Sequence, residues 1–312
     1  MTNKHPKVSV IGLGYIGLPT AAIIARKGIN VCGVDINKKV VDTINSGKIH
    51  IVEKGLESVV SKVIKEEKFK AYTKLEQSDV FLIAVPTPFK KNNSLIPEPD
   101  ISFVKAAVEQ ISSVIKKGDL IILESTSPVG TSEIIFKMII EKSKLKKDDF
   151  FLAYCPERVL PGNILWELEN NSRVVGGINK SSTKAAINFY SLFCLGEINA
   201  TDSNTAELVK LAENSYRDVN LAFSNELSMI CNELDINVYS LINLANKHPR
   251  VNILQPGVGV GGHCIAVDPW FLVSHFKEDS KLNYPKSYNY EHSEAEPEII
   301  LQDRAFWHEI KE

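Results

Sequence analysis

The chain has 312 residues, of which 44% are hydrophobic and 24% charged, and 36 basic against 38 acidic side chains give a net charge of −2. This length suits about two domains. The composition is that of a globular protein and excludes a disordered, collagen-like or coiled-coil chain. The even charge balance predicts no nucleic-acid partner and no anionic-membrane surface.

Neither the start of the chain nor its cysteines indicate a secreted or membrane protein. Residues 1–7 are polar and run straight into an apolar segment, without the apolar core of a signal peptide. No apolar run approaches the roughly 20 residues that a bilayer span needs. Five scattered cysteines form no C-x-x-C pair: Cys32, Cys155, Cys194, Cys231 and Cys264. The pattern predicts reduced thiols, no metal site and a cytoplasmic protein.

The first part of the chain alternates short apolar runs with helical patterns. We expect strands at residues 7–11, 30–34, 80–85 and 120–123, with a helix over residues 17–27. Continuous apolar strands separated by helices predict a parallel sheet covered on both faces, an α/β fold of the doubly wound Rossmann type.

The pattern changes near residue 201. Residues 205–234 form a helical stretch without glycine or proline, a second helix is expected over residues 238–247, and the chain becomes glycine-rich near Gly257. A long helix after an α/β domain indicates a mainly helical second domain. The prediction is therefore of three parts: a Rossmann-like domain over residues 1–200, a helical central domain over residues 201–276, and an atypical tail over residues 277–312 with a short helix over residues 299–310.

Glycines directly after the first expected strand indicate a dinucleotide site. Gly12, Gly14 and Gly17 form a G-x-G-x-x-G run that opens a helix, and Asp35 ends the second strand. The glycines permit a tight turn, close approach of a pyrophosphate and close helix packing. Asp35 is suited to accept hydrogen bonds from ribose hydroxyls, which favours NAD over NADP. A structural glycine turn in another α/β protein is the alternative.

Two loops carry threonines after later strands. Thr87 follows the strand at residues 80–85, and Thr126 follows the strand at residues 120–123. Ligands of doubly wound sheets bind at the carboxyl ends of the strands, so these hydroxyls are candidates for contacting the cofactor or ordering a water. Ordinary Ser/Thr turns are the alternative.

The long helix carries a polar stripe. Lys210, Asn214 and Arg217 are spaced i, i+4, i+7 and share one face, for which solvent exposure is the alternative. Beyond it, Cys264 ends the glycine-rich loop just before Asp268 and a proline, a pair typical of a helix start. The loop makes this thiol a candidate nucleophile rather than an inert core thiol.

Three longer motifs make the chain resemble a known family. They are C-P-E-R-V-L-P-G at residues 155–162, K-L-A-E-N-S-Y-R at residues 210–217 and G-G-H-C-I-A-V-D at residues 261–268. They resemble the NAD-dependent nucleotide-sugar 6-dehydrogenases, the UDP-glucose/GDP-mannose dehydrogenase family, from about Lys7 to Phe271.

The resemblance implies oxidation of a sugar CH₂OH to a carboxylate with two NAD⁺, on a UDP-sugar for polysaccharide precursors, by a homodimer. Pro161, His263 and Val267 differ from the glucose enzymes of the family and favour its N-acetylmannosamine branch.

The resemblance also implies residue roles, and it implies no metal. The chemical roles are Cys264 as nucleophile, Lys210 as general acid/base, Asn214 for the oxyanion, Asp268 as a supporting carboxylate, and Glu157 and Thr126 for the hydrolytic water. Substrate contacts are implied at Arg158, Val159, Lys210, Asn214, Arg217, His248, Arg250 and Gly261. NAD contacts are implied at Gly12, Gly14, Tyr15, Ile16, Gly17, Asp35, Thr87 and Thr126.

One departure from the family bears on activity. The family continues into a second α/β domain that covers the nucleotide, whereas this chain ends at Glu312 and stops resembling the family near Ser274. Remote binding energy drives orientation at the reacting carbon, so we expect little turnover from this chain alone. Two other interpretations remain: a two-electron β-hydroxyacid dehydrogenase and a non-catalytic NAD-binding remnant.

Overall fold

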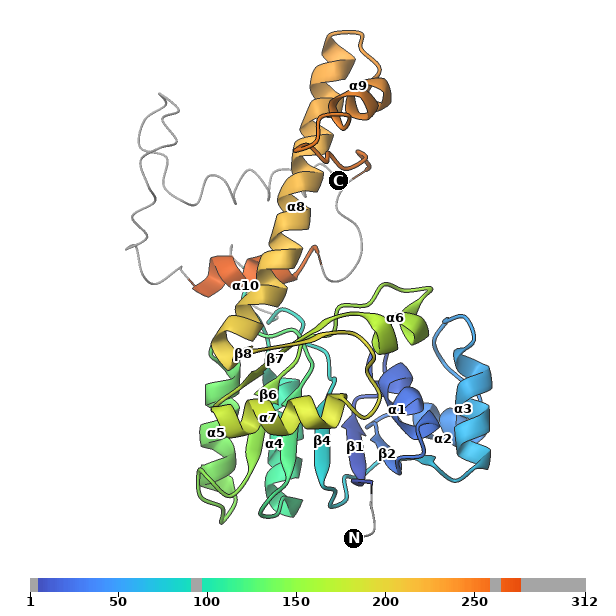
Figure 1. Ribbon diagram of the computed structural model, residues 1–312, viewed down its shortest axis with the longest axis vertical. Coiled ribbons are helices and arrows are strands. Elements are labelled where there is room, and N and C mark those ends of the chain that lie inside the picture. Colours follow the sequence, from blue (N-terminus) through green and yellow to red (C-terminus); the bar gives the residue numbers. More distant parts are fainter. Residues whose placement is uncertain (1–4, 91–96, 259–264, 276–312) are drawn as a thin grey trace. The chain divides into compact units, whose positions relative to one another are not determined.

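The computed structural model describes residues 5–90, 97–258 and 265–275, and the chain divides into two compact units (Figure 1). The first unit comprises residues 1–88 and 100–210, and the second comprises residues 89–99 and 211–312. Among the described residues, no helix has the length and apolar character that a membrane span needs.

The first unit is built on one eight-stranded sheet with the strand order β3-β2-β1-β4-β5-β6-β7-β8. The strands are β1 (Val8–Ile11), β2 (Val31–Val34), β3 (Phe69–Tyr72), β4 (Val80–Ile83), β5 (Leu120–Leu123), β6 (Phe151–Tyr154), β7 (Arg173–Gly177) and β8 (Ile198–Asp202). The order of the first six strands, with the reversal beside β1, is that of a Rossmann fold. The predicted doubly wound α/β fold is confirmed.

Helices cover both faces of this sheet. They are α1 (Gly17–Arg26), α2 (Lys38–Asn45), α3 (Leu56–Lys65), α4 (Ser102–Val114), α5 (Thr131–Lys142), α6 (Ile164–Asn170) and α7 (Lys180–Tyr190). One hydrophobic cluster joins the sheet to α1, α2, α3, α6 and α7, and a second joins it to α4 and α5. Val80 and Leu82 belong to the first cluster, whereas Phe81 and Ile83 belong to the second. Because both faces of such a strand are buried, its sequence is a continuous apolar run.

One strand pair departs from the predicted parallel arrangement. Strands β6 and β7 are antiparallel, with Tyr154 opposite Gly176. The chain leaves β6 at its carboxyl end, forms the short helix α6 there and enters β7 from the same end (Figure 1). A full crossover to the other end of the sheet, which parallel strands need, is absent between them.

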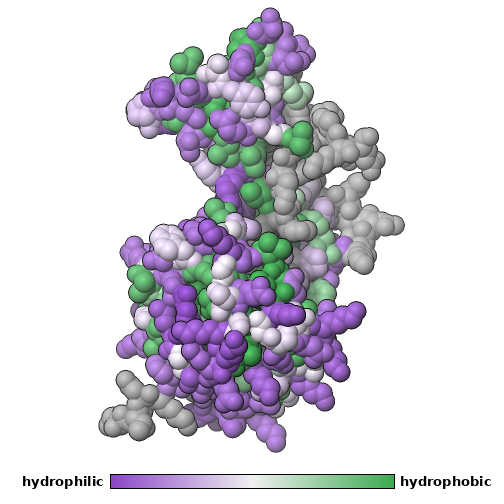
Figure 2. All heavy atoms as spheres, turned by 90° about the vertical axis from the view of Figure 1, so that its right-hand side faces the viewer, coloured by the Kyte–Doolittle hydropathy of each residue, from purple (hydrophilic) through white to green (hydrophobic). Residues whose placement is uncertain are grey.

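The second unit is mainly helical, as predicted for the central domain. It contains most of α8 (Ser203–Glu233), which begins in the first unit, together with α9 (Val238–Ala245) and α10 (Asp268–His275). Cys231, Val238 and Ile242 form the small core between α8 and α9. Other hydrophobic side chains of this unit lie on its surface, where Figure 2 shows them in green. The expected tail over residues 277–312, with its helix over residues 299–310, lies outside the described residues.

Candidate active site

The glycine run forms a tight turn between β1 and α1. Gly12 has φ +89°, and a Cβ there would lie 2.5 Å from the Ala84 carbonyl oxygen. A Cβ on Gly17 would lie 1.8 Å from the oxygen of Gly12, so both positions exclude a side chain. A Cβ on Gly14 would meet nothing within 4 Å. The backbone at Gly14 is therefore open to a ligand at the start of α1, where phosphates bind favourably.

Asp35 is held beside this turn at the end of β2. Its Oδ2 accepts a hydrogen bond from the backbone N–H of Leu13 at 3.1 Å, and its Oδ1 accepts one from Asn37 at 2.8 Å. Each carboxylate oxygen keeps lone pairs for the hydroxyls of a ribose. Tyr15 and Ile16 lie at the entrance to α1, with Tyr15 53% exposed. The residues of this turn fit the dinucleotide that the motif predicts.

The two threonine loops are joined at the carboxyl ends of β4 and β5. The Thr87 hydroxyl donates a hydrogen bond to the carbonyl oxygen of Thr126 at 2.7 Å. Ser125 donates in turn to the carbonyl of Val85 at 2.7 Å. These bonds bring together two of the residues predicted to contact the cofactor, although they are 39 positions apart.

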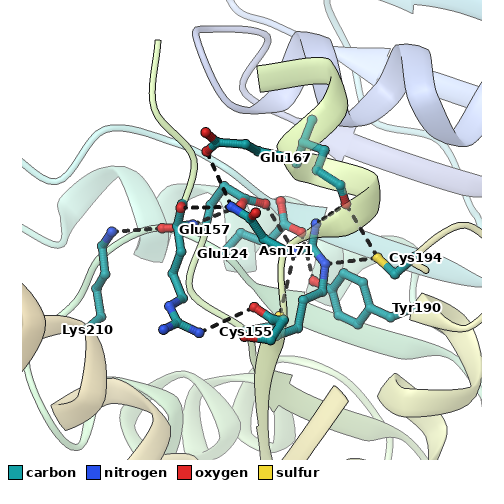
Figure 3. A network of polar contacts seen from close by, with 12 residues as sticks. Glu124, Cys155, Glu157, Glu167, Asn171, Tyr190, Cys194 and Lys210 are labelled. Atoms are coloured by element: carbon teal, nitrogen blue, oxygen red, sulfur yellow. Dashed lines mark hydrogen bonds and ion pairs between the residues drawn. The ribbon is translucent and has the colours of Figure 1, made fainter. Parts of the chain in front are cut away.

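Glu157 lies directly after β6 and is pinned by three donors (Figure 3). Its Oε1 accepts from the backbone N–H of Arg158 at 2.8 Å, and its Oε2 accepts from Arg173 at 3.0 Å. Its carbonyl oxygen accepts from Nζ of Lys210 at 2.8 Å. The structure thus brings together Glu157 and Lys210, which are 53 positions apart, and both residues are buried.

A second carboxyl group lies in the same interior as Glu157. The hydroxyl of Tyr190 donates to Oε1 of Glu124 at 2.7 Å, and Glu124 is buried. Burial raises the pKa of Glu124 to about 7, and the negative charge of Glu157 adds to this effect. Burial also raises the pKa of the Cys155 thiol to about 12. Cys155 is therefore a neutral core thiol and a poor nucleophile.

The polar stripe of α8 continues in the second unit. The Asn214 amide nitrogen donates to the carboxylate of Asp268, the first residue of α10, and Arg217 donates to the Asn214 carbonyl oxygen. Asn214 and Asp268 are buried. Cys264 and Gly261, predicted as nucleophile and substrate contact, lie outside the described residues.

The remaining predicted substrate residues lie in two other places. His248 and Arg250 are exposed in the turn after α9. Helix α9 packs near Cys231, so it lies beside the end of α8 that is far from Asn214. Arg158 donates to the carbonyl of Ser172 at 3.3 Å, and the half-buried Val159 packs against the core of the first unit.

Comparison with known proteins tests the predicted family. The NAD-binding-domain model of the UDP-glucose/GDP-mannose dehydrogenase family matches residues 6–194, and the model of its central domain matches residues 204–288. The chain belongs to this family. The predicted membership is confirmed, and so is NAD as the cofactor of the domain that carries Gly12 and Asp35.

Individual relatives are 42–54% identical to this chain over the residues that align. A UDP-N-acetyl-D-mannosamine dehydrogenase of Campylobacter jejuni is 54% identical over 288 residues, 90% of this chain and 70% of that protein. An NDP-N-acetyl-D-galactosaminuronic acid dehydrogenase of Ralstonia nicotianae is 51% identical over 88% of this chain and 66% of that protein. A solved UDP-D-ManNAc dehydrogenase of Pyrococcus horikoshii has a TM-score of 0.83 at 42% identity, over 88% of this chain and 65% of that one. The chain spans about two thirds of the length of these relatives.

Sequence reasoning missed several polar residues around Glu157. Arg173, Glu124 and Tyr190 form one buried network with it. Arg173 gives no sequence signal because a single basic residue at the start of an apolar strand is common. Among the described residues, no group of three His, Cys, Asp or Glu side chains is arranged to hold a metal ion.

Proposed function

We propose that this protein catalyses the NAD-dependent four-electron oxidation of UDP-N-acetyl-D-mannosamine to UDP-N-acetyl-D-mannosaminuronate. The observation that carries the proposal is the buried pair of Lys210 and Glu157, in which Nζ of Lys210 donates a 2.8 Å hydrogen bond to the backbone carbonyl oxygen of Glu157, a residue of the NAD-binding domain. The name of the Campylobacter jejuni relative supports this choice of sugar.

The chemistry assigned to the chain's residues proceeds through Cys264. A base takes the proton of the sugar hydroxyl in the first oxidation, and the Cys264 thiolate then adds to the aldehyde carbon to form a thiohemiacetal. Lys210 and Asn214 stabilise the oxyanion of that adduct. The second oxidation leaves a thioester, which water hydrolyses to the acid with the help of Glu157. NAD⁺, when bound, accepts the hydride of each oxidation.

The hydrogen bonds of Asn214 support its role at the oxyanion. An arginine side chain can only donate and a carboxylate can only accept, so contacts with Arg217 and Asp268 define which amide atom is oxygen and which is nitrogen. The amide nitrogen carries two N–H groups, and Asp268 takes one of them. The other is available to a developing oxyanion.

The stoichiometry of NADH tests this function. We expect two NADH for each UDP-N-acetyl-D-mannosamine consumed, measured by absorbance at limiting sugar. One NADH would indicate the two-electron β-hydroxyacid type, and none despite calorimetric NAD⁺ binding would indicate the non-catalytic remnant. UDP-N-acetyl-D-galactosamine is assayed in parallel, because a relative with 51% identity is named for the galactosaminuronic acid. Faster turnover of that sugar would reassign the substrate.

Cys264→Ser gives the matched test of the nucleophile. Serine is a weak nucleophile without an activating base, so the variant should stop before the second oxidation or trap an ester. Iodoacetamide should modify Cys264 before Cys155 and Cys194, whose pKa values burial raises, and bound substrate should protect it. Uronic acid release at the native rate from Cys264→Ser would exclude this nucleophile.

We further propose a cytoplasmic homodimer that supplies precursors of surface polysaccharides. The four described cysteines are free, as in a reduced compartment. The second unit exposes large apolar side chains on α8 and α9, which a partner chain would cover: Val219, Phe223, Met229, Ile230 and Leu244. Light scattering should give twice the mass of the chain. The mass of a single chain would contradict the dimer.

A further inference from the structure

Arg173, the first residue of β7, is buried with only 3% of its surface exposed. Its Nη1 donates to Oε2 of Glu157 at 3.0 Å, and its Nη2 donates to the carbonyl oxygen of Leu168 at 3.0 Å. Its Nε donates to the sulfur of Cys194 at 2.9 Å. All three nitrogens of the guanidinium group are therefore bonded, and the group has a fixed orientation.

Besides Glu157, the groups around Arg173 are Tyr190, two thiols and Glu124, and of these Glu124, whose pKa burial raises to about 7, titrates near neutral pH. The ring of Tyr190 lies 4.8 Å from the guanidinium carbon, and the sulfur of Cys155 lies 3.9 Å from Nη1. Burial raises the pKa of Tyr190 and of both thiols, so none of them carries charge near neutral pH. A buried arginine is costly unless it is paired. Among the described residues, the carboxylate that bonds Arg173 is that of Glu157.

Arg173 also fixes the direction of the Glu157 carboxylate. One oxygen accepts from Arg173 and the other from the backbone N–H of Arg158, so rotation about the last side-chain bond breaks both contacts. Nζ of Lys210 donates a hydrogen bond to the backbone carbonyl oxygen of Glu157. Each carboxylate oxygen still has a lone pair free, and its direction follows from the two donors.

We propose that Arg173 is a positioning residue that aims the Glu157 carboxylate at the water that hydrolyses the thioester. This inference rests on the proposed function, in which Glu157 handles that water. The water oxygen adds to the thioester carbon and its proton passes to Glu157. The carbon–sulfur bond then breaks, and sulfur leaves as the Cys264 thiolate. A freely rotating carboxylate would slow this step and leave both hydride transfers unaffected.

Rapid mixing of the chain with NAD⁺ and UDP-N-acetyl-D-mannosamine separates these steps. The rate of the initial NADH burst reports the oxidations, and the steady-state rate reports hydrolysis. In Arg173→Lys, which keeps the charge but not the forked geometry, we expect the steady-state rate to fall about tenfold or more while the burst rate stays within about threefold. Intact-mass spectrometry should show the sugar bound to Cys264 during steady state.

A double-mutant cycle distinguishes positioning from general damage to the core. If Arg173 acts through Glu157, then Arg173→Lys should change the hydrolysis rate less than about twofold once Glu157→Gln is present. Additive effects of the two substitutions would overturn the inference. Glu157→Asp provides a second test in which Arg173 is unchanged. The shorter side chain keeps a carboxylate but places it farther from Arg173. A native ratio of burst to steady-state rate in this variant would also overturn the inference.

Two controls separate the possible failures. Glu53→Gln alters the opposite end of the loop that carries Glu157, because Glu53 bonds Gly162 and Ile164. Glu53→Gln should leave the ratio of burst to steady-state rate unchanged. If Glu53→Gln changes this ratio as much as Arg173→Lys does, the effect comes from loosening of the loop and not from Arg173. A native chain that forms neither NADH nor an adduct refutes the proposed function, and this inference with it. A native chain that turns over while Arg173→Lys behaves normally refutes the inference alone.

Discussion

Asp35 determines which nicotinamide cofactor the glycine turn accepts. Its carboxylate is held in place by the backbone N–H groups of Leu13 and Asn37, so it cannot swing away from a 2′-phosphate. We expect NAD⁺ to bind more tightly than NADP⁺ by a few kcal/mol, from charge repulsion and the loss of charge-assisted hydrogen bonds. Asp35→Asn should narrow this difference, as measured by calorimetry with both cofactors. Equal affinities in the native chain would contradict this role.

Glu207 is a buried carboxylate with a definite structural role. It lies on α8, yet it accepts hydrogen bonds from the backbone N–H groups of Gly130 and Ser132 at 2.6 and 2.7 Å, and from the Ser132 hydroxyl at 2.7 Å. These N–H groups belong to the start of α5, which would otherwise lack partners. Glu207 therefore caps one helix from another and fixes the first turns of α8 beside the Thr126 loop.

Replacement of Glu207 should weaken the fold. Glu207→Gln turns an amide N–H toward donors that need an acceptor, and we expect it to lower the free energy of unfolding by about 2 kcal/mol. Urea unfolding followed by circular dichroism measures this change. Glu141→Gln, at an exposed position on α5, is the control and should change it by less than about 0.5 kcal/mol. Equal effects of the two substitutions would rule out the capping role.

At the scale of elements, the loop that carries Glu157 is fastened at both ends. Arg173 and Lys210 hold its beginning. Its end is held by Glu53, whose carboxylate accepts from the backbone N–H of Gly162 at 2.8 Å and of Ile164 at 3.0 Å. Helix α6 starts at this point, and its own N-cap side chain makes no capping bond. Glu53 therefore supplies the cap from a distant segment.

Removal of this cap should loosen one element. In Glu53→Ala, we expect amide hydrogen exchange of residues 160–166 to rise about tenfold or more, because α6 has only seven residues and loses its N-terminal acceptors. Mass spectrometry of proteolytic fragments measures the exchange, with β4 and β5 as internal references that should not change. Glu57→Ala, at an exposed position on α3, is the matched control. Unchanged exchange over residues 160–166 would show that α6 does not depend on Glu53.

The sequence predicted four of the strands that lie inside the sheet, and it missed the buried, apolar strand β6 together with β3, β7 and β8. Strands β1, β2, β4 and β5 are almost entirely buried and therefore read as apolar segments. Strands β3 and β8 are the edges of the sheet and expose some of their residues, so they lack such a run. Strand β7 ends in two glycines, which sequence patterns associate with turns.

The candidate site divides in a similar way. The Gly12 turn and Asp35 were predictable because strand, turn and acidic residue follow one another at a known spacing. Contacts between residues that are far apart in the sequence have no characteristic spacing by which they could be predicted. Glu53 bonds Gly162 109 positions away, and Glu207 bonds Gly130 77 positions away. Which of these segments meet is decided by the order of the strands in the sheet, and no local spacing in the sequence encodes that order.

At the scale of the whole molecule, one buried carboxyl group links the stability of the fold to pH. Glu124 follows β5 at the centre of the sheet, and its Oε2 has no hydrogen-bond partner among the described residues. The groups that face it are Glu157, Arg173, Tyr190 and Cys155. Burial raises its pKa to about 7, the charge of Glu157 adds to the shift, and Arg173 and Tyr190 oppose it. The folded protein therefore favours the protonated, neutral form of this group.

This preference predicts how stability changes with pH. The pKa of Glu124 rises from 4.5 to about 7 on folding, so between these values the folded chain holds a proton that the unfolded chain has lost. The free energy of unfolding should therefore fall as the pH rises through this window, by roughly 3 kcal/mol from this group, and then level off. Glu124→Gln keeps an acceptor for Tyr190 and stays neutral. It should match the native chain at pH 5 and exceed its stability at pH 8, in urea unfolding at both pH values. An equal difference between variant and native chain at pH 5 and pH 8 would exclude Glu124 as the source.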